Sequence, residues 1–428
     1  MAEARRAIEE TRFGGPCARH GHGARACPAA IPALVLLLAG ACLATPRDSG
    51  KAAGDVNANI RRRGSLGNSR VQFEKNRKGH VAFLGGSITE MNGYRPMVCD
   101  WLKKRFGDTT FTFTNAGIAS TCSTTGAFRL RRDVLEKGPA DLLFIEFAVN
   151  DDQDAAHARR ECIRGMEGIL RHVRLHNPLA DIVVTYFVNP GMLAALRAGK
   201  TPLPIAAHED VATHYAVSTI HLAREVAGRI DAGRLTWEQF GGTHPARRGN
   251  ALCAGMIQHL LTAAWAKPLP ANAAKVKHAV PERPLDERSY WRGRFVDPKR
   301  AKLAAGWKVH VPEWKKLPGR CRGRFEDAAL LCADRAGAEL TLEFTGTAVG
   351  AYVLAGPDAG TVEAAIDGGK PKAVDLYHRF SRGLHYPRTV VFDADLAPGK
   401  HTLRLRVTDR RNKSSSGTAM RILHFVAN

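Results

Sequence analysis

The sequence predicts a three-layer α/β/α domain of the flavodoxin-like type, with a parallel sheet, followed by an antiparallel β-sandwich. Two observations lead to this prediction. Up to about residue 268, short apolar runs alternate with segments whose apolar residues recur at helical spacing, which is typical of a parallel sheet covered by helices. Beyond Pro268, apolar residues recur at every second position, which is typical of strands with one buried face.

Length and composition allow two or three globular domains. The chain has 428 residues, of which 44% are hydrophobic, enough for a packed core. It carries 63 Lys and Arg against 41 Asp and Glu, a formal charge of +22. The basic residues are scattered through both halves and no nucleic-acid-binding motif accompanies them. We therefore interpret the charge as a solvated surface and expect no specific nucleic-acid partner.

Residues 1–45 are interpreted as a leader. Ile31–Ala44 is an apolar segment of fourteen residues, too short for a comfortable membrane span but suited to the hydrophobic region of a signal peptide. Cleavage after Ala41 or Ala44 and a lipid anchor on Cys42 are alternative ends for this leader, and a disordered arm with one apolar patch is a third reading. The prediction is a secreted protein or one held in the cell envelope or periplasm.

A polar linker is expected at residues 46–67, and the α/β domain at residues 68–268. The apolar runs predict five strands: Val81–Leu84, Thr110–Thr114, Leu142–Phe147, Asp181–Phe187 and Val217–Leu222. Helical spacing predicts helices at four places: Tyr94–Phe106, Cys162–Val173, Glu209–Tyr215 and Cys253–Leu261.

A second linker is expected at residues 269–289, where Pro281 and Pro284 stand among charged residues. Residues 290–428 then form the predicted β-sandwich. Its strands are indicated by alternating apolar residues, such as those from Leu340 to Phe344 and from Leu403 to Val407. Asp367 and Gly368, between two such runs, are typical of a hairpin turn.

The nine cysteines do not form a recognisable metal-binding or disulfide pattern. Because there is no CxxC or HExxH motif, neither a metal nor another cofactor is expected. Cys321 and Cys332 are placed to bridge a hairpin in an oxidising compartment. The remaining cysteines outside the leader are expected to be buried free thiols: Cys99, Cys122, Cys162 and Cys253.

The first predicted strand ends abruptly in Gly85-Gly86-Ser87. In open α/β sheets, ligands bind at the carboxyl ends of the strands, so Ser87 there is interpreted as an exposed, reactive serine. The other reading is a serine that caps the helix running through Met97 to Phe106.

Three further motifs follow in order along the chain. Asn115-Ala116-Gly117 ends the second strand, Ala148-Val149-Asn150-Asp151 ends the third, and Thr243-His244-Pro245 precedes the last helix. Together with Gly-Gly-Ser-Ile-Thr, they resemble the four blocks of the SGNH (GDSL-type) hydrolase superfamily. The resemblance covers about residues 78–265 and implies the SGNH hydrolase fold and a serine esterase.

The resemblance also implies a role for each block. Ser87 would be the nucleophile and His244 the base that takes its proton. The oxyanion hole would be formed by the backbone N–H of Ser87, the backbone N–H of Gly117 and the side-chain amide of Asn150. Without the other blocks, Gly117 would be read as a turn glycine, Asn150 as a helix cap and His244 as a solvated loop residue.

Three positions depart from the family pattern. Gly86 stands where Asp is usual, and Ala148 where Gly is usual. The triad acid normally lies three residues before the histidine, and here that position is Gly241. His244 would therefore work in a Ser–His dyad or be oriented by another acceptor. The candidates for this acceptor are Glu238, Asp231, Asp151 and a backbone carbonyl.

The expected activity is the hydrolysis of acyl esters, above all acetyl esters, on a carbohydrate. The leader and the appended sandwich, which looks like the accessory modules of some bacterial SGNH esterases, favour a glycan substrate and a polysaccharide contact through the C-terminal domain. The alternatives are a lipid esterase or thioesterase, and a non-catalytic glycan-binding protein on a hydrolase scaffold. The last alternative is suggested by the missing acid at Gly241.

Overall fold

A computed structural model describes residues 56–428 of the protein. The predicted leader, with Ile31–Ala44 and Cys42, lies outside the described residues. Among the helices between residues 56 and 428, none is both long enough and apolar enough to cross a membrane.

The first domain has a six-stranded sheet in the order β1-β6-β5-β4-β2-β3. The five strands predicted from the sequence are all present and mutually parallel, and β1 is antiparallel to β6. β4 and β5 are buried along their whole length, which explains their uninterrupted apolar character. The strands are β1 (Ile60–Arg61), β2 (Lys78–Gly85), β3 (Thr110–Gly117), β4 (Leu142–Glu146), β5 (Asp181–Thr185) and β6 (Ser218–Ile220).

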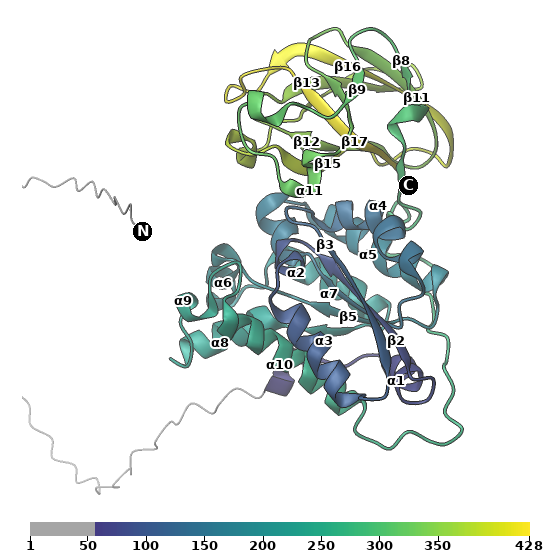
Figure 1. The fold of residues 1–428 in the computed structure, drawn as a ribbon, viewed down its shortest axis with the longest axis vertical. Helices are drawn as coiled ribbons and strands as arrows, with labels where there is room; N and C mark the ends of the chain where they lie inside the picture. The colour runs from purple at the N-terminus through teal and green to yellow at the C-terminus, as the bar shows by residue number, and fades with distance from the viewer. Residues whose placement is uncertain (1–55) are drawn as a thin grey trace, which may run out of the picture. The chain divides into compact units, whose positions relative to one another are not determined.

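Helices cover both faces of this sheet, as Figure 1 shows, so the predicted three-layer α/β/α fold is confirmed. α3 and α10 pack together on one face, and α4, α5 and α7 pack in a row on the other. This division follows from right-handed connections, because the chain moves from β2 outward to β3 and then back across the sheet. The helices are α1 (Gly67–Glu74), α2 (Ser87–Glu90), α3 (Tyr94–Arg105), α4 (Ser123–Asp133), α5 (Arg159–His176), α6 (Pro190–Arg197), α7 (Leu203–His214), α8 (Leu222–Asp231), α9 (Trp237–Phe240) and α10 (Arg247–Ala264).

The predicted linker at residues 46–67 is wrong for its described part. Ile60 pairs with Ile220 at the edge of the sheet. Arg63 donates to the Thr219 hydroxyl at 3.2 Å and forms an ion pair with Glu209. These contacts fix to the α/β domain a segment whose composition alone predicted a linker without such contacts.

The second predicted linker, at residues 269–289, has no helix or strand but is fixed to the first domain. The buried carboxylate of Glu167, on α5, accepts hydrogen bonds from the backbone of Leu285 and Asp286 and from the Ser289 hydroxyl. His278 contacts the buried Asp181 at 2.7 Å. The segment is therefore held along the α/β domain at both of these points.

The C-terminal domain is an antiparallel β-sandwich, as predicted. One sheet has the order β15-β12-β17-β10-β9, with β7 beside β17, and the other has the order β14-β13-β16-β11-β8. Asp367 and Gly368, both with positive φ, connect β13 and β14 in the predicted hairpin. The strands are β7 (Arg294–Val296), β8 (Lys302–Leu303), β9 (Lys308–His310), β10 (Leu330–Ala333), β11 (Glu339–Gly346), β12 (Val349–Ala355), β13 (Gly360–Ile366), β14 (Lys372–Asp375), β15 (Tyr386–Asp393), β16 (Gly399–Arg411) and β17 (Met420–Ala427).

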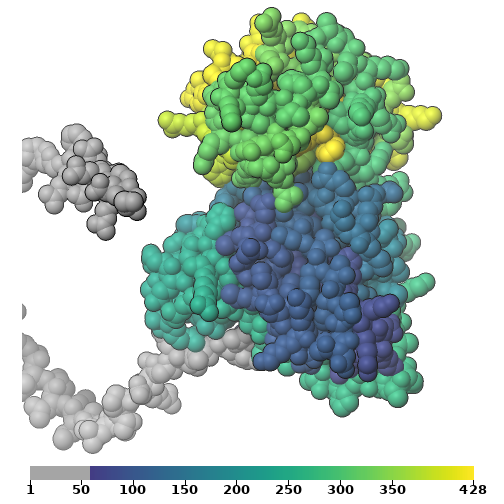
Figure 2. All heavy atoms as spheres, viewed as in Figure 1, coloured from purple at the N-terminus to yellow at the C-terminus, as the bar shows by residue number. Residues whose placement is uncertain are grey.

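β12 is buried on both faces and serves two cores. Ala351 and Val353 belong to the apolar cluster inside the sandwich, whereas Tyr352 and Leu354 belong to the cluster that includes the α/β domain. In the space-filling view, the green and yellow atoms of the sandwich lie directly against the blue atoms of the first domain (Figure 2). The two domains therefore share a continuous apolar core.

The predicted disulfide between Cys321 and Cys332 is wrong, because both thiols are free. Cys332 lies in β10, where its sheet neighbours are Arg421 and Lys308. Cys321 lies in the loop before the short helix α11 (Gly323–Glu326), so the two cysteines do not face each other across a hairpin.

Candidate active site

Ser87 and His244, distant in sequence, meet at the carboxyl end of β2. Ser87 is the first residue of α2, and its Oγ lies 2.8 Å from Nε2 of His244. The serine is half-buried and the histidine is exposed, so both are accessible. α3 begins at Tyr94 after Gly93, so Ser87 does not cap that helix.

Glu146, the last residue of β4, stabilises the turn that carries Ser87 through hydrogen bonds. Oε1 of Glu146 accepts hydrogen bonds from the Gly86 N–H and the Thr89 hydroxyl, both at 2.8 Å. Oε2 is buried without a hydrogen-bond partner. Because burial disfavours the charged form, the pKa of Glu146 is raised to about 7.

A fully buried arginine joins the ends of the two strands that carry the first two motifs. The guanidinium of Arg129, on α4, donates to the carbonyl of Gly85 at 2.8 Å and to that of Ala116 at 2.7 Å. Asp133 pairs with it at 3.1 Å. Arg129 thus fixes β2 and β3 relative to each other immediately before Ser87 and Gly117.

The His244 loop has no room for the acid that the family pattern places three residues earlier. Gly241 ends α9 in the left-handed conformation, with φ +103°, and a Cβ there would lie 1.9 Å from the backbone nitrogen of Ala246. The loop is tied down by Asn250, whose amide donates to the Pro245 carbonyl and accepts from the Tyr94 N–H. Close backbone packing therefore excludes a side chain at position 241.

None of the three candidate acids contacts His244 in the described part of the chain. Glu238 is fully exposed on α9, where hydrogen bonding from its own backbone lowers its pKa. Asp231 pairs with Arg197 at 2.7 Å. Asp151 is buried and accepts hydrogen bonds from Ser123. The geometry at Ser87 is therefore that of a Ser–His pair without a carboxylate.

The three predicted oxyanion donors differ in availability. The Ser87 N–H lies in the first turn of α2, where amides have no intrahelical acceptor. The Gly117 N–H is not free as predicted, because the Asn115 side chain folds back and accepts it at 3.0 Å. Asn150 donates one amide hydrogen to the carboxylate of Asp154, which leaves the second.

The amide of Asn150 lies directly against the residue that precedes the nucleophile. A Cβ on Gly86 would come within 2.1 Å of Asn150 Oδ1. This close approach leaves no room at position 86 for the Asp side chain that is usual in the family. Asn150 begins η3 (Asn150–Asp154), and α5 starts only at Arg159, so neither Asn150 nor Asp151 caps that helix.

Sequence reasoning did not find three residues that support this site, namely Glu146, Arg129 and Asn250. Glu146 had a signal, since it is the one charged residue in an otherwise apolar strand. Arg129 and Asn250 had none, because they stand among other polar residues on amphipathic helices.

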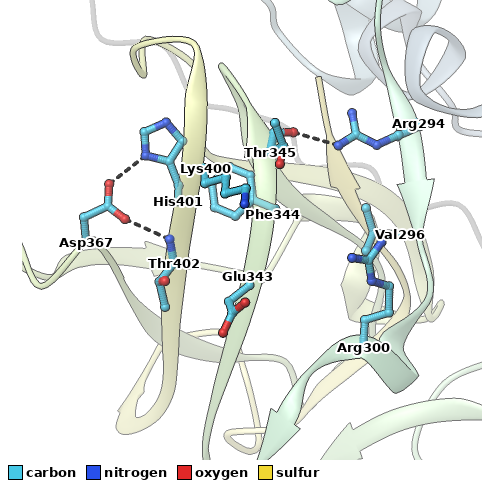
Figure 3. A pocket seen from close by; sticks show the side chains of 10 residues that line it. All are labelled: Arg294, Val296, Arg300, Glu343, Phe344, Thr345, Asp367, Lys400, His401 and Thr402. Atoms are coloured by element: carbon cyan, nitrogen blue, oxygen red, sulfur yellow. Dashed lines mark hydrogen bonds and ion pairs between the residues drawn. The ribbon is translucent and has the colours of Figure 1, made fainter.

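The sandwich carries a separate hollow of about 360 Å³, drawn in Figure 3. Arg294, Arg300 and Lys400 line it with positive charge, Glu343 and Asp367 line it with negative charge, and Phe344 contributes an aromatic ring. Arg294 donates to the Thr345 carbonyl at 2.7 Å. Arg300 and Lys400 form no ion pair with any described carboxylate.

Comparison with known proteins bears on both domains. Residues 83–252 match the sequence profile of the GDSL-like lipase/acylhydrolase family, whereas no curated protein matches the chain. A solved structure of a two-domain esterase active on acetylated mannans has a TM-score of 0.70 and 20% sequence identity, covering 87% of this chain and 98% of its own. A second structure, of such an esterase co-crystallised with mannopentaose, has a TM-score of 0.69 and 20% identity, with coverages of 87% and 97%.

At this identity the structural likeness concerns the fold, and it extends over the α/β domain and the sandwich together. The profile match concerns the segment that contains Ser87, Gly117, Asn150 and His244. Residues 83–252 therefore form a domain of the GDSL-like lipase/acylhydrolase type, as predicted for an SGNH-type serine esterase, and the fold of the whole described chain is that of a two-domain esterase with a C-terminal accessory domain.

Proposed function

We propose that this esterase removes acyl groups, above all acetyl groups, from a carbohydrate, with Ser87 as nucleophile and His244 as base. The observation that carries the proposal is the 2.8 Å contact between Ser87 Oγ and His244 Nε2 at the carboxyl end of a parallel strand. The carbohydrate substrate is supported by the two structural neighbours, which are esterases active on acetylated mannans.

In the proposed reaction, Ser87 Oγ attacks the ester carbonyl carbon while Nε2 of His244 takes the hydroxyl proton. The oxyanion is stabilised by the Ser87 N–H and the second amide hydrogen of Asn150. The C–O bond to the sugar then breaks, and the imidazolium returns its proton to the departing sugar oxygen. In the second half of the reaction His244 takes a proton from a water molecule, whose oxygen attacks the acyl carbon. The bond from this carbon to Ser87 Oγ breaks, the imidazolium returns its proton to Oγ, and the carboxylic acid leaves.

Two features modify this scheme. His244 acts in a dyad, because Gly241 leaves no space for the usual acid and no other carboxylate of residues 56–428 reaches the imidazole. The Gly117 N–H joins the oxyanion hole only when it releases the Asn115 side chain. Both features predict a slower enzyme than a complete triad would give.

A polymeric substrate is supported by the position of the accessory domain at the edge of the site. Arg324 of α11 pairs with Glu90, three residues after the nucleophile, at 3.0 Å. Arg322 donates to the Ala119 carbonyl at 2.6 Å and to the Ser120 hydroxyl at 2.7 Å. A glycan that presents an ester to Ser87 would therefore meet both domains.

We also propose a polysaccharide contact at the hollow of the sandwich that Arg300, Lys400 and Phe344 line. Arg300 and Lys400 offer unpaired charges and Phe344 an aromatic surface. Loss of affinity for an acidic polysaccharide in an Arg300→Gln, Lys400→Gln double variant would support this contact, and unchanged affinity would contradict it.

Secretion or attachment to the cell envelope remains our proposal from the apolar segment Ile31–Ala44. N-terminal sequencing of the mature protein from its native host tests it. A mature chain that begins near Cys42 or after Ala44 is expected, and one that keeps Met1 would contradict it.

The experiment on the central proposal compares Ser87→Ala with Ser414→Ala, which removes an exposed serine of the sandwich. Hydrolysis of p-nitrophenyl acetate and release of acetate from acetylated mannan are measured. Both activities should vanish in Ser87→Ala and persist in Ser414→Ala. Wild-type turnover by Ser87→Ala would overturn the mechanism, and activity on the nitrophenyl ester alone would overturn the substrate.

A further inference from the structure

We propose that Cys122, Asp151 and His157 form a binding site for a divalent transition-metal ion of the zinc type. One ligand atom from each side chain, a thiol sulfur, a carboxylate oxygen and an imidazole nitrogen, lies within 4.8 Å of the other two. The sequence predicted no metal because these residues do not fall in a known motif. The fold brings them together from three separate segments.

The backbone places each ligand. Cys122 is the residue that precedes α4, Asp151 lies in η3, and His157 lies two residues before α5. The His157 N–H donates to the Asp151 carbonyl at 2.9 Å, which closes the loop between them. The site therefore sits where two neighbouring helices begin.

The spacing suits tetrahedral coordination. Nδ1 of His157 is buried and lies at ion-pair distance, 3.5 Å, from Oδ1 of Asp151, with no shorter hydrogen bond. With metal–ligand bonds of about 2.0–2.3 Å at tetrahedral angles, neighbouring ligand atoms are about 3.3–3.8 Å apart. Because all three ligand atoms lie within 4.8 Å of one another, the sulfur needs to approach by about 1 Å at most.

A second layer of hydrogen bonds orients the carboxylate. Oδ2 of Asp151 accepts from the Ser123 hydroxyl at 2.6 Å and contacts Nε2 of His208 at 2.8 Å. Oδ1 accepts only the Ser123 N–H, at 2.7 Å, so it keeps a lone pair directed at His157. Carboxylates that bind metal ions are commonly held in this way.

The site also has an open side for a fourth ligand. Cys122 and His157 line a cavity of about 310 Å³, together with Asp154 and Tyr386. Water from this cavity can complete a tetrahedral shell. Binding must displace the thiol proton of Cys122 and the proton that Cys122 and Asp151 favour on His157, whose pKa they raise despite its burial. A thiolate, a carboxylate and a neutral imidazole then balance the two charges of the ion.

The ligand set selects the ion. Thiolate and imidazole favour Zn²⁺ and Co²⁺ over Mg²⁺ and Ca²⁺, which prefer oxygen ligands. A bound ion would fix η3 to the start of α4 and so restrain Asn150, the residue before Asp151. The site would thus stabilise the segment next to Ser87 without taking part in the reaction.

The test is a cobalt titration of the full chain after treatment with a chelator. Thiolate-bound tetrahedral Co²⁺ gives a charge-transfer band in the near ultraviolet and intense visible bands, which should saturate at one equivalent. Cys122→Ser should remove the ultraviolet band, and His157→Gln should weaken binding at least tenfold. Cys332→Ser, which removes a buried thiol of the sandwich, and Ser87→Ala should leave both bands unchanged.

Two results would overturn the site. One is a wild-type protein without these bands, and the other is a Cys122→Ser variant that keeps them. Circular dichroism shows whether each variant folds, and if Cys122→Ser does not fold, His157→Gln decides. Zn²⁺ should raise the Tm of the wild type by several degrees but not that of folded His157→Gln. Because Ser87→Ala still binds metal, failure of the esterase proposal would not affect this outcome.

Discussion

Two clusters in the described part of the chain each contain a serine and a histidine, and they differ in whether a carboxylate lies between the two side chains. At the surface, the Ser87 hydroxyl faces the His244 imidazole directly, and no carboxylate in the described part of the chain reaches them. In the interior, Asp151 lies between the other two, accepting from Ser123 and contacting His208. Ser123, Asp151 and His208 are all fully buried.

The difference shows that the sequence of hydrogen bonds between the side chains and their accessibility to substrate, more than the residue types, decide which cluster can catalyse a reaction. A nucleophilic hydroxyl must pass its proton to an imidazole and must reach a substrate. Ser87 meets both conditions. The Ser123 hydroxyl gives its hydrogen bond to a carboxylate in the protein interior, so that cluster supports structure.

The largest expected effect is at the surface cluster. His244→Ala should lower kcat/KM on an acetyl ester by about a thousandfold or more, because Ser87 loses its proton acceptor. Glu238→Gln should change it less than about twofold, because a dyad does not use that carboxylate. His310→Ala, at an exposed histidine of β9, is the control.

Equal and near-total losses in His244→Ala and Glu238→Gln would make Glu238 a full triad member and refute the dyad. An active His244→Ala would refute the mechanism as written.

A substitution in the interior cluster should lower the stability of the folded protein. Asp151→Asn places an amide donor against the Ser123 donors and removes a buried acceptor, so the free energy of unfolding should fall by about 3 kcal/mol. Urea denaturation in the presence of a chelator measures this loss without any contribution from metal. Asp210→Asn makes the same change in an exposed ion pair with Arg159 and should cost less than about 1 kcal/mol. Similar losses in the two variants would remove the structural distinction between the clusters.

A third variant tests the residue beside Asp151. Asn150→Ala should lower kcat by about a hundredfold through loss of one oxyanion donor. Its KM should change little, because the donor acts mainly in the transition state. Asn76→Ala, at an exposed asparagine, is the matched control. A change confined to KM would assign Asn150 to substrate binding.

The smallest expected effect is on the pH dependence of the free energy of unfolding. It comes from Glu146, whose carboxylate accepts hydrogen bonds from the turn that carries Ser87. Its folded pKa of about 7 exceeds the ordinary value of 4.5, so between these pH values the folded protein keeps a proton that the unfolded chain releases. The free energy of unfolding should therefore fall with rising pH in this window, by about 2 kcal/mol between pH 5 and pH 8.

Glu146→Gln keeps the oxygen that accepts from Gly86 and Thr89 but cannot ionise, so this fall should disappear from its pH profile. Glu282→Gln, at an exposed residue, should keep the wild-type profile. Parallel profiles for wild type and Glu146→Gln would show that Glu146 does not titrate in this range.

Much of the fold could be predicted because its signals are local. The apolar runs of β4 and β5 report burial on both faces, and the alternation in β16 reports burial on one. The edge strand at Ile60 escaped prediction because two residues give no periodicity. The Cys321–Cys332 prediction failed because sequence distance does not tell which strand lies beside Cys332.

The site was predictable in its parts but not in its hydrogen bonds. The four blocks placed Ser87 and His244 at strand ends and loops, and the structure brings their side chains into contact. That Asn115 occupies the Gly117 N–H, or that Ala246 excludes a side chain at Gly241, depends on backbone approaches between residues that no local pattern records.

The double burial of β12 has a consequence for how the molecule unfolds. Tyr352 and Leu354 face the α/β domain, while Val353 faces the sandwich interior. Unfolding of either core therefore removes packing contacts that stabilise the other. Heating should then give one calorimetric transition for both domains rather than two. An α/β domain expressed without the sandwich would expose the apolar surface that these residues cover, and it should aggregate.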